Sequence, residues 1–332
     1  QYEIFEVKKE LKLNYEYGLL KNYHSSIMPS PNPSERNLDS SIDSNKFNPD
    51  LSHFKCINTL QGPFETIVCL ILLISGDLAS GSYDKTIRIW EKNSQRDKKT
   101  ISETGKVFCL LEFEENMLLS GNSEKNIILW NLNSNDGTPV HKFTGHKLWV
   151  NCLVKINENI FASASNDANI KIWNYRTRSC EKSLKGHSDC ILSLIALKNR
   201  NAFRNGNLCS GSADTTIKIW NWEAQETTKL CIGDLRGHEG WVKCICELSD
   251  GMIASGSDDK KIIIWKDKII FMTLIEHTHS VRGLCQLNEN YFVSCSFDGT
   301  LKIWDINGEK DKSVQTLNGH TSNVIGVVKI NG

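Results

Sequence analysis

Short apolar runs of strand length alternate with polar turn segments along most of the chain. Residues 150–184 show the pattern clearly. The four runs there are Val150–Ile156, Ile160–Ser165, Ile170–Tyr175 and Cys180–Leu184. Between them lie Asn-Glu-Asn, Asn-Asp-Ala and Arg-Thr-Arg, which are turn-forming or strongly polar. Because no stretch after residue 52 keeps a helical period, the pattern predicts an all-β fold made of four-stranded units.

The unit recurs six times, and each copy carries a tryptophan at the same place. These are Trp90, Trp130, Trp173, Trp220, Trp265 and Trp304, separated by 40, 43, 47, 45 and 39 residues. This spacing is typical of repeats of about 40–45 residues that each form one propeller blade. The tenth residue before each tryptophan is serine, and the sixth before it is aspartate or glutamate. Gly-His pairs end at His146, His187, His238 and His320, and His277 follows a glutamate at the equivalent place.

The unit resembles the WD40 repeat, and the resemblance covers about residues 54–332. It implies a β-propeller in which the His, Ser, Asp and Trp of one blade form a buried hydrogen-bonded tetrad. The tetrads would be His146, Ser163, Asp167 and Trp173; His187, Ser210, Asp214 and Trp220; His238, Ser255, Asp259 and Trp265; and His277, Ser294, Asp298 and Trp304. A catalytic Ser-His-Asp triad is the alternative, but it needs one exposed nucleophile, whereas these residues recur in four units. We therefore expect a structural role and no enzymatic activity.

Two units depart from the pattern. The first has Gly62-Pro63 where Gly-His is expected, and the second has Thr104-Gly105-Lys106, with Glu124 in place of the aspartate. We expect these two blades to be looser than the others or braced in another way.

The chain ends decide the expected number of blades. Phe54–Leu60 matches the outermost strand of a unit, and Val324–Ile330 matches an innermost strand. We therefore expect a seven-bladed propeller whose last blade is incomplete in this chain, since a ring must cover its open sheet edges. A six-bladed ring with two extra end strands is the alternative. We also expect the natural protein to extend beyond Gln1 and Gly332.

The residues before the repeats differ in kind. Ile4, Val7, Leu11 and Tyr15 fall at helical spacing, which predicts a short helix at residues 1–22, the end of an upstream helical or coiled-coil region. A packing helix or a frayed end is the alternative. Residues 23–52 have the Ser-, Pro- and Asn-rich composition of a disordered linker. The propeller then occupies residues 53–332, and an upstream coiled coil would allow oligomers.

The resemblance also implies where partners bind. In WD40 proteins, a peptide most often binds to one face of the propeller. This face carries the loops between blades and the turns between the second and third strands. The residues of that face would be Tyr83, Trp149, Asn151, Asn166, Trp241, Lys243, Asp258, Arg282 and Phe297. Trp149 and Trp241 follow a Gly-His by three residues, where core packing requires no aromatic side chain. Trp, Tyr and Arg are frequent at the energetic centres of interfaces, so we expect a protein-interaction scaffold.

Two alternative functions remain at this stage. The sequence from Trp173 to Arg176 reads Trp-Asn-Tyr-Arg and is similar to the Trp-Asp-x-Arg motif by which some WD40 proteins dock onto the adaptor of cullin–RING ubiquitin ligases. The chain would then be a substrate receptor. In the other alternative, it is the regulatory propeller of a larger protein with an upstream enzymatic domain.

Composition narrows the set of partners. Lys plus Arg and Asp plus Glu are 39 each, so the zero formal charge argues against nucleic acid or a membrane surface as the partner. The longest apolar run, Ile67–Ile74, is far below the roughly 20 residues that span a bilayer. The twelve cysteines contain no CxxC pair and lie mostly in apolar strands, so we expect neither a disulfide scaffold nor a metal site. We expect no cofactor and a cytoplasmic location, with the nucleus as the alternative.

Overall fold

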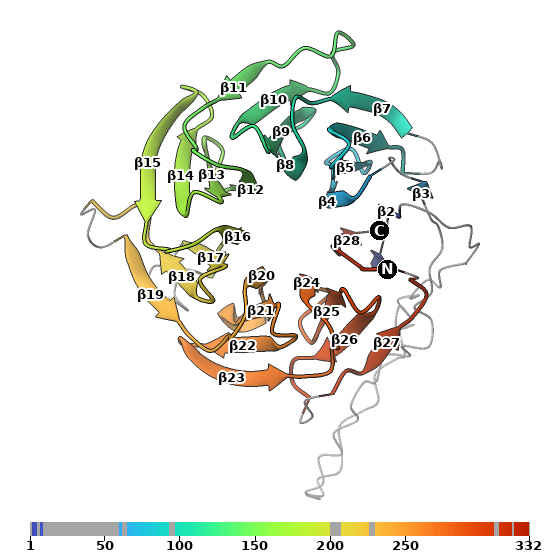
Figure 1. The fold of residues 1–332 in the computed structure, drawn as a ribbon, viewed down its shortest axis with the longest axis vertical. Helices are drawn as coiled ribbons and strands as arrows, with labels where there is room; N and C mark the ends of the chain where they lie inside the picture. Colours follow the sequence, from blue (N-terminus) through green and yellow to red (C-terminus); the bar gives the residue numbers. More distant parts are fainter. Residues whose placement is uncertain are drawn as a thin grey trace, which may run out of the picture.

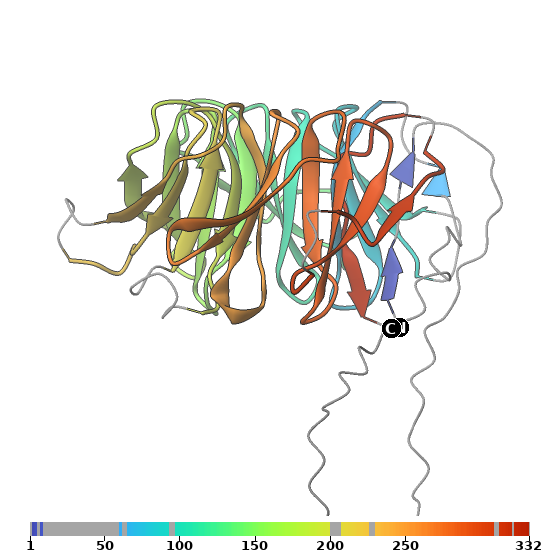
Figure 2. The same cartoon turned by 90° about the horizontal axis from the view of Figure 1, so that it is seen from below.

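Six antiparallel four-stranded sheets stand around a common axis in the computed structural model, and each sheet is one blade (Figure 1). The structure describes residues 2–4, 7–8, 60–61, 65–92, 97–199, 207–225, 230–308, 312–320 and 322–331. Figure 2 shows the ring from the side, with the strands running between its two faces.

The blades follow one another along the chain. The first contains β4 (Ile67–Leu72), β5 (Leu78–Ser82), β6 (Thr86–Trp90) and β7 (Asp97–Ser102), and the second β8 (Val107–Glu114), β9 (Met117–Asn122), β10 (Ile127–Asn131) and β11 (His141–Phe143). The third contains β12 (Val150–Lys155), β13 (Ile160–Ser165), β14 (Asn169–Asn174) and β15 (Ser179–Lys185), and the fourth β16 (Ile191–Ala196), β17 (Leu208–Ser212), β18 (Ile217–Trp220) and β19 (Cys231–Leu235). The fifth contains β20 (Val242–Glu247), β21 (Ile253–Ser257), β22 (Ile262–Lys266) and β23 (Ile269–Leu274), and the sixth β24 (Val281–Gln286), β25 (Tyr291–Ser296), β26 (Leu301–Asp305) and β27 (Gln315–Leu317).

Burial follows the position of each strand within its blade. The second strands, such as β13 and β17, are buried at every residue because strands flank both edges and neighbouring blades cover both faces. Among the outermost strands, β7 (DKKTIS) and β15 (SCEKSLK) carry polar residues and are exposed at most positions. The outermost strand of the fifth blade, β23 (IIFMTL), is an exception, because it is apolar and its first three residues are exposed. The gradient in the first and third blades explains why their apolar runs become polar toward the end of the unit.

The hydrophobic core lies between adjacent blades. Ile172 of the third blade, for example, packs in one cluster with Ile191 and Leu208 of the fourth. Close approach of the blades requires small residues where the first two strands pair. A Cβ atom at Gly211 would lie 2.6 Å from both the Ser193 Oγ and the Val242 Cγ1 of the next blade. A side chain at position 211 would therefore prevent the fourth and fifth blades from packing this closely.

The expectation of seven blades is wrong: the described residues form six four-stranded blades. In the gap between the first and sixth blades, residues of both chain ends and the segment just before the first blade form two short two-stranded sheets (Figure 1). β1 (Tyr2–Ile4) pairs antiparallel with β28 (Lys329–Asn331), and β2 (Val7–Lys8) pairs parallel with β3 (Leu60–Gln61). These four short strands pair as two separate two-stranded sheets, so they do not form a seventh four-stranded blade.

The helix expected at residues 1–22 is also not supported, because its described residues lie in the strands β1 and β2. The spacing of Ile4 and Val7 fits a helical turn, but backbone pairing with β28 and β3 decides the conformation here. Residues 9–22 of this segment and the linker expected at 23–52 lie outside the described residues.

Candidate functional site

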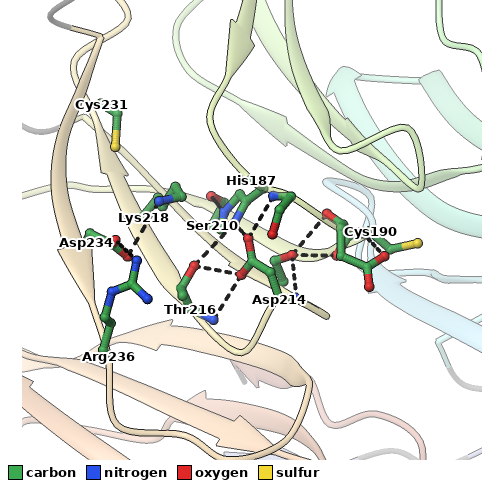
Figure 3. A network of polar contacts seen from close by, with 12 residues as sticks. His187, Cys190, Ser210, Asp214, Thr216, Lys218, Cys231, Asp234 and Arg236 are labelled. Carbon is green, nitrogen blue, oxygen red and sulfur yellow. Dashed lines mark hydrogen bonds and ion pairs between the residues drawn. The ribbon is translucent and has the colours of Figure 1, made fainter.

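Four blades bring together the predicted His, Ser, Asp and Trp side chains. Figure 3 shows the fourth blade, where His187 Nδ1 lies 2.7 Å from Asp214 Oδ2 and His187 Nε2 lies 2.8 Å from Ser210 Oγ. The Trp220 indole N–H donates to the same Ser210 Oγ at 2.8 Å. All groups are satisfied if the histidine is neutral, because the serine hydroxyl then donates to Nε2 and Nδ1–H donates to the carboxylate.

The geometry is nearly the same in the other three blades. His–Asp distances are 2.9 Å in the third blade, 2.8 Å in the fifth and 2.7 Å in the sixth. The serine, which accepts from the tryptophan and contacts the histidine, is 0% exposed in all four blades. A substrate carbonyl cannot reach a serine that is enclosed in this way. The tetrads therefore act as internal braces of the blades.

The tetrad aspartates also connect two loops of each blade. Asp298 Oδ2 accepts the Thr278 backbone N–H at 3.1 Å, and Oδ1 accepts both the hydroxyl and the N–H of Thr300. Burial raises the pKa of Asp298, but the hydrogen bonds from Thr300 and His277 outweigh it and bring the pKa down to about 2. Burial also lowers the pKa of His277, which favours the neutral imidazole. Both shifts keep this tetrad in its neutral-histidine, charged-aspartate state at physiological pH.

The second blade is braced by a residue that the sequence analysis missed. Glu103 is 8% exposed; it accepts a hydrogen bond from the Ser120 hydroxyl, and another from Asn122 Nδ2 at 3.0 Å. Trp130 Nε1 donates to Ser120 Oγ at 2.9 Å, as in the tetrads. Burial raises the pKa of the Glu103 carboxyl. Its position in the sequence is the signal for this role. Glu103 lies seventeen residues before Ser120, and in three of the four tetrads the histidine lies seventeen residues before the serine.

A pocket of about 510 Å³ opens at one face of the ring, on the propeller axis. Its lining comes from loops between blades, from turns after the second strands and from the first residues of innermost strands. The lining residues are Val68, Tyr83, Phe108, Trp149, Asn151, Asn166, Asp189, Cys190, Leu192, Ala213, Trp241, Lys243, Arg282 and Ile325. Seven of the nine residues predicted for the partner face are among them. The other two, Asp258 and Phe297, contact Lys243 and Arg282 from outside the lining.

A β-bulge in the innermost strand of every blade supplies one of these lining residues. Near the start of each innermost strand, the pairing with the second strand skips one residue in all six blades; β8 skips a second one, Phe113, farther along. The residues skipped near the strand starts are Val68, Phe108, Asn151, Leu192, Lys243 and Arg282. A bulge leaves one residue without a partner in the ladder and re-aims its side chain. All six of these residues line the pocket.

Aromatic rings form one wall of the pocket. The Phe108 and Trp149 rings are stacked with centroids 5.2 Å apart, and Tyr83 meets Phe108 edge-on at 5.7 Å. Trp149 is 46% exposed and Trp241 is 50% exposed, whereas the tryptophans of the six repeats are buried. Large exposed aromatic surfaces of this kind, around a concave site, are typical of contact surfaces for a ligand or a protein partner.

The residues expected to dock a ligase adaptor have other contacts. Trp173 is buried within the tetrad of the third blade. Arg176 Nη2 forms an ion pair with Glu114 Oε1 of the second blade at 2.6 Å, and its guanidinium lies over the ring of the preceding residue, Tyr175. The docking role of Trp173 and Arg176 stays a prediction.

Two negative findings apply to the described part of the chain. None of its segments forms a helix with the length and apolar character needed to span a bilayer. No three His, Cys, Asp or Glu side chains in the described ranges gather as they would around a metal ion.

Comparison with known proteins identifies the class. The family model described as "WD domain, G-beta repeat" matches residues 54–91, 137–174, 178–221, 229–266 and 270–305, which is more than half of the chain. The chain therefore belongs to the WD40 repeat family. The segment between the first two matches contains Glu103 and most of the second blade, where the histidine of the pattern is absent.

Three relatives match short segments of the chain. The chain is 35% identical over 108 residues to telomerase protein component 1 of Mus musculus, which covers 30% of the chain and 4% of that protein. It is 33% identical over 85 residues to periodic tryptophan protein 2 of Arabidopsis thaliana, covering 24% of the chain and 9% of that protein. It is 48% identical over 52 residues to ribosome biogenesis protein YTM1 of Debaryomyces hansenii, covering 15% of the chain and 11% of that protein. In each case, the match spans a small part of the relative's length.

Proposed function

We propose that the chain is a non-catalytic protein-interaction scaffold that binds a segment of a partner protein in the pocket on its axis. The observation that carries the proposal is the pair of half-exposed tryptophans, Trp149 and Trp241, at a concave site built by all six blades. The repeats make the scaffold rigid, because each tetrad closes its own hydrogen bonds inside a blade. The face can then present fixed side chains to one partner from several blades at once.

The names of the relatives fit a scaffold of this kind. They refer to telomerase and to ribosome biogenesis, and the WD40 fold is what the chain shares with them. A rigid propeller that joins components of a larger assembly would suit both names. The cytoplasmic location stays a prediction.

Substitution of the two tryptophans tests the proposal. Proteins captured from cell extract by the wild-type chain are compared quantitatively with those captured by Trp149→Ala and Trp241→Ala. Leu148→Ala is the matched control, because Leu148 is a neighbour of Trp149 with 45% exposure but does not line the pocket. We expect specific partners to be lost with both tryptophan variants and retained with the control, at unchanged melting temperatures. Identical sets of partners for all four proteins would contradict the assignment of the pocket.

A further inference from the structure

Arg282 is a cation of the pocket whose charge is not balanced within the described part of the chain. It is the bulge residue of β24, and its guanidinium lies over the Phe297 ring with its central carbon 4.7 Å from the ring centroid. No carboxylate of the described residues lies within ion-pair distance of it, and among the same residues its buried Nε finds no hydrogen-bond acceptor. A buried donor without an acceptor destabilises the free protein, so an acceptor supplied by a ligand would remove this cost.

The neighbouring blade contributes a second cation, but its charge is already balanced. Lys243 Nζ lies 3.3 Å from Asp258 Oδ2, and Asp258 Oδ1 accepts a hydrogen bond from the Ser280 hydroxyl. Burial lowers the pKa of Lys243, and the charge of Arg282 lowers it further. The two cations therefore lie close enough to repel each other. Asp258 compensates one of them, which leaves the charge of Arg282 available.

The aromatic rings of this face do not favour a cationic ligand. Their faces are already approached by the chain's own cations. Lys106 Nζ lies 4.6 Å from the Tyr83 centroid, and Lys243 Nζ lies 4.3 Å from the Trp241 centroid. A positively charged ligand group would meet these ammonium groups at the same rings. Asp189 is the one carboxylate among the lining residues, and its Oδ1 already accepts the Cys190 N–H at 2.6 Å.

We propose that Arg282, with Lys243 beside it, binds an oxyanion of the partner segment while an adjacent apolar side chain packs on the Phe108–Trp149 wall. The oxyanion is a carboxylate of Asp or Glu or the phosphate of a phosphorylated side chain, since both match the planar fork of a guanidinium. This inference rests on the proposed function and specifies the chemistry of the segment that is bound.

A protein segment is favoured over nucleic acid as the source of the oxyanion. Nucleic-acid binding depends on many simultaneous phosphate contacts along a charged track. The pocket lining contains only two cations, and the chain has a formal charge of zero. A pocket of about 510 Å³ is suited to a few side chains rather than to a strand of stacked bases.

A peptide selection followed by a double-mutant cycle tests the inference. Random short peptides displayed on phage are selected on the wild-type chain and counter-selected on Trp149→Ala, so that binders of the pocket are kept. The selected peptides are then titrated by fluorescence polarisation against wild type, Arg282→Gln and Arg282→Lys. Lys266→Gln is the matched control, because Lys266 lies over the Phe271 ring on the outer part of the fifth blade, away from the pocket lining.

We expect the selected peptides to contain a recurrent acidic residue next to an apolar one. Arg282→Gln should weaken their binding about tenfold or more, which is the effect of losing one hydrogen bond to a charged group. Arg282→Lys should fall between wild type and Arg282→Gln, and Lys266→Gln should bind as wild type does. Replacing the acidic residue of the peptide by its amide should weaken binding to wild type by the same factor. It should hardly change binding to Arg282→Gln. Comparison of Glu with phosphoserine at that position shows which oxyanion is preferred.

Three outcomes would overturn the inference in distinguishable ways. Peptides that depend on Trp149 but bind wild type and Arg282→Gln equally would contradict the oxyanion site and leave the proposed function standing. A library that yields no peptide dependent on Trp149 would contradict both. Binding of a single-stranded oligonucleotide that is lost in Arg282→Gln, without any peptide binding, would assign the oxyanion to nucleic acid. Equal melting temperatures of the variants exclude unfolding as the cause.

Discussion

Replacing Asp214 by asparagine should measure how much one tetrad contributes to stability. The Asp214 carboxylate accepts four hydrogen bonds, from His187 Nδ1 at 2.7 Å, from the Ser188 N–H at 3.0 Å, and from the Thr216 N–H and hydroxyl at 3.0 and 2.6 Å. In Asp214→Asn, the side-chain oxygen can still serve Thr216. The amide nitrogen then replaces Oδ2 and faces the two remaining N–H donors. The variant therefore loses the bonds from His187 and Ser188 while its volume hardly changes.

Two hydrogen bonds to a charged acceptor contribute about 1.5–3 kcal/mol each, so the free energy of unfolding should fall by about 3–6 kcal/mol. Urea unfolding followed by tryptophan fluorescence measures this difference. Glu239→Gln is the control, because it removes the same charge from an exposed ion pair with Lys261 and should cost no more than about 1 kcal/mol. A loss for Asp214→Asn that is no larger than that of the control would refute the view that the tetrads brace the blades.

Three further changes test other parts of the structure. Gly211→Ala should lower the free energy of unfolding by about 1–3 kcal/mol, because the new methyl group would overlap Val242 of the next blade, and thermal unfolding will show it. Thr215→Gly should raise the unfolding free energy by about 1 kcal/mol, since Thr215 has a φ of 66° that a β-branched residue adopts only under strain. Burial raises the pKa of the Glu103 carboxyl in the folded state. Protonation of Glu103 therefore adds to the free energy of unfolding below the ordinary carboxyl pKa. This stabilisation is lost as the pH rises through the folded-state pKa. In wild type, the free energy of unfolding measured with urea should therefore decline above pH about 4.5, and in Glu103→Gln this decline should be smaller. The same pH profile in both proteins would contradict this prediction.

The apolar pattern and the repeat period predicted an all-β propeller, and the resemblance to the WD40 repeat implied the residues that its tetrads bring together. A contact made in one blade recurs in the others, so fixed intervals along the sequence become fixed contacts in space. The same resemblance, mapped onto the repeat register, indicated seven of the fourteen residues that line the pocket, including Trp149, Trp241 and Arg282. Glu103 was not predicted, because the second unit has Gly105 but no histidine after it, and only the distance of seventeen residues to Ser120 distinguishes Glu103.

Two other features could not be predicted from local pattern. Val68, Phe108 and Leu192 are apolar residues within apolar strands, so they resemble core positions, and only the bulge turns them toward the pocket. The pairing of the chain ends in place of a seventh blade is a long-range event that joins residues more than 300 positions apart in β1 and β28. Neither spacing nor composition carries this information.

The bulge residues of the innermost strands line the pocket, whereas the paired residues of the same strands hold the sheets together. The skipped residue of each innermost strand has no partner in the ladder, so its side chain can be exchanged without altering the register of the sheet. Each of the six blades contributes one such position to the lining of the pocket. A gene duplicate of this chain could therefore acquire a new binding preference through a few substitutions at these positions while retaining the same stable framework.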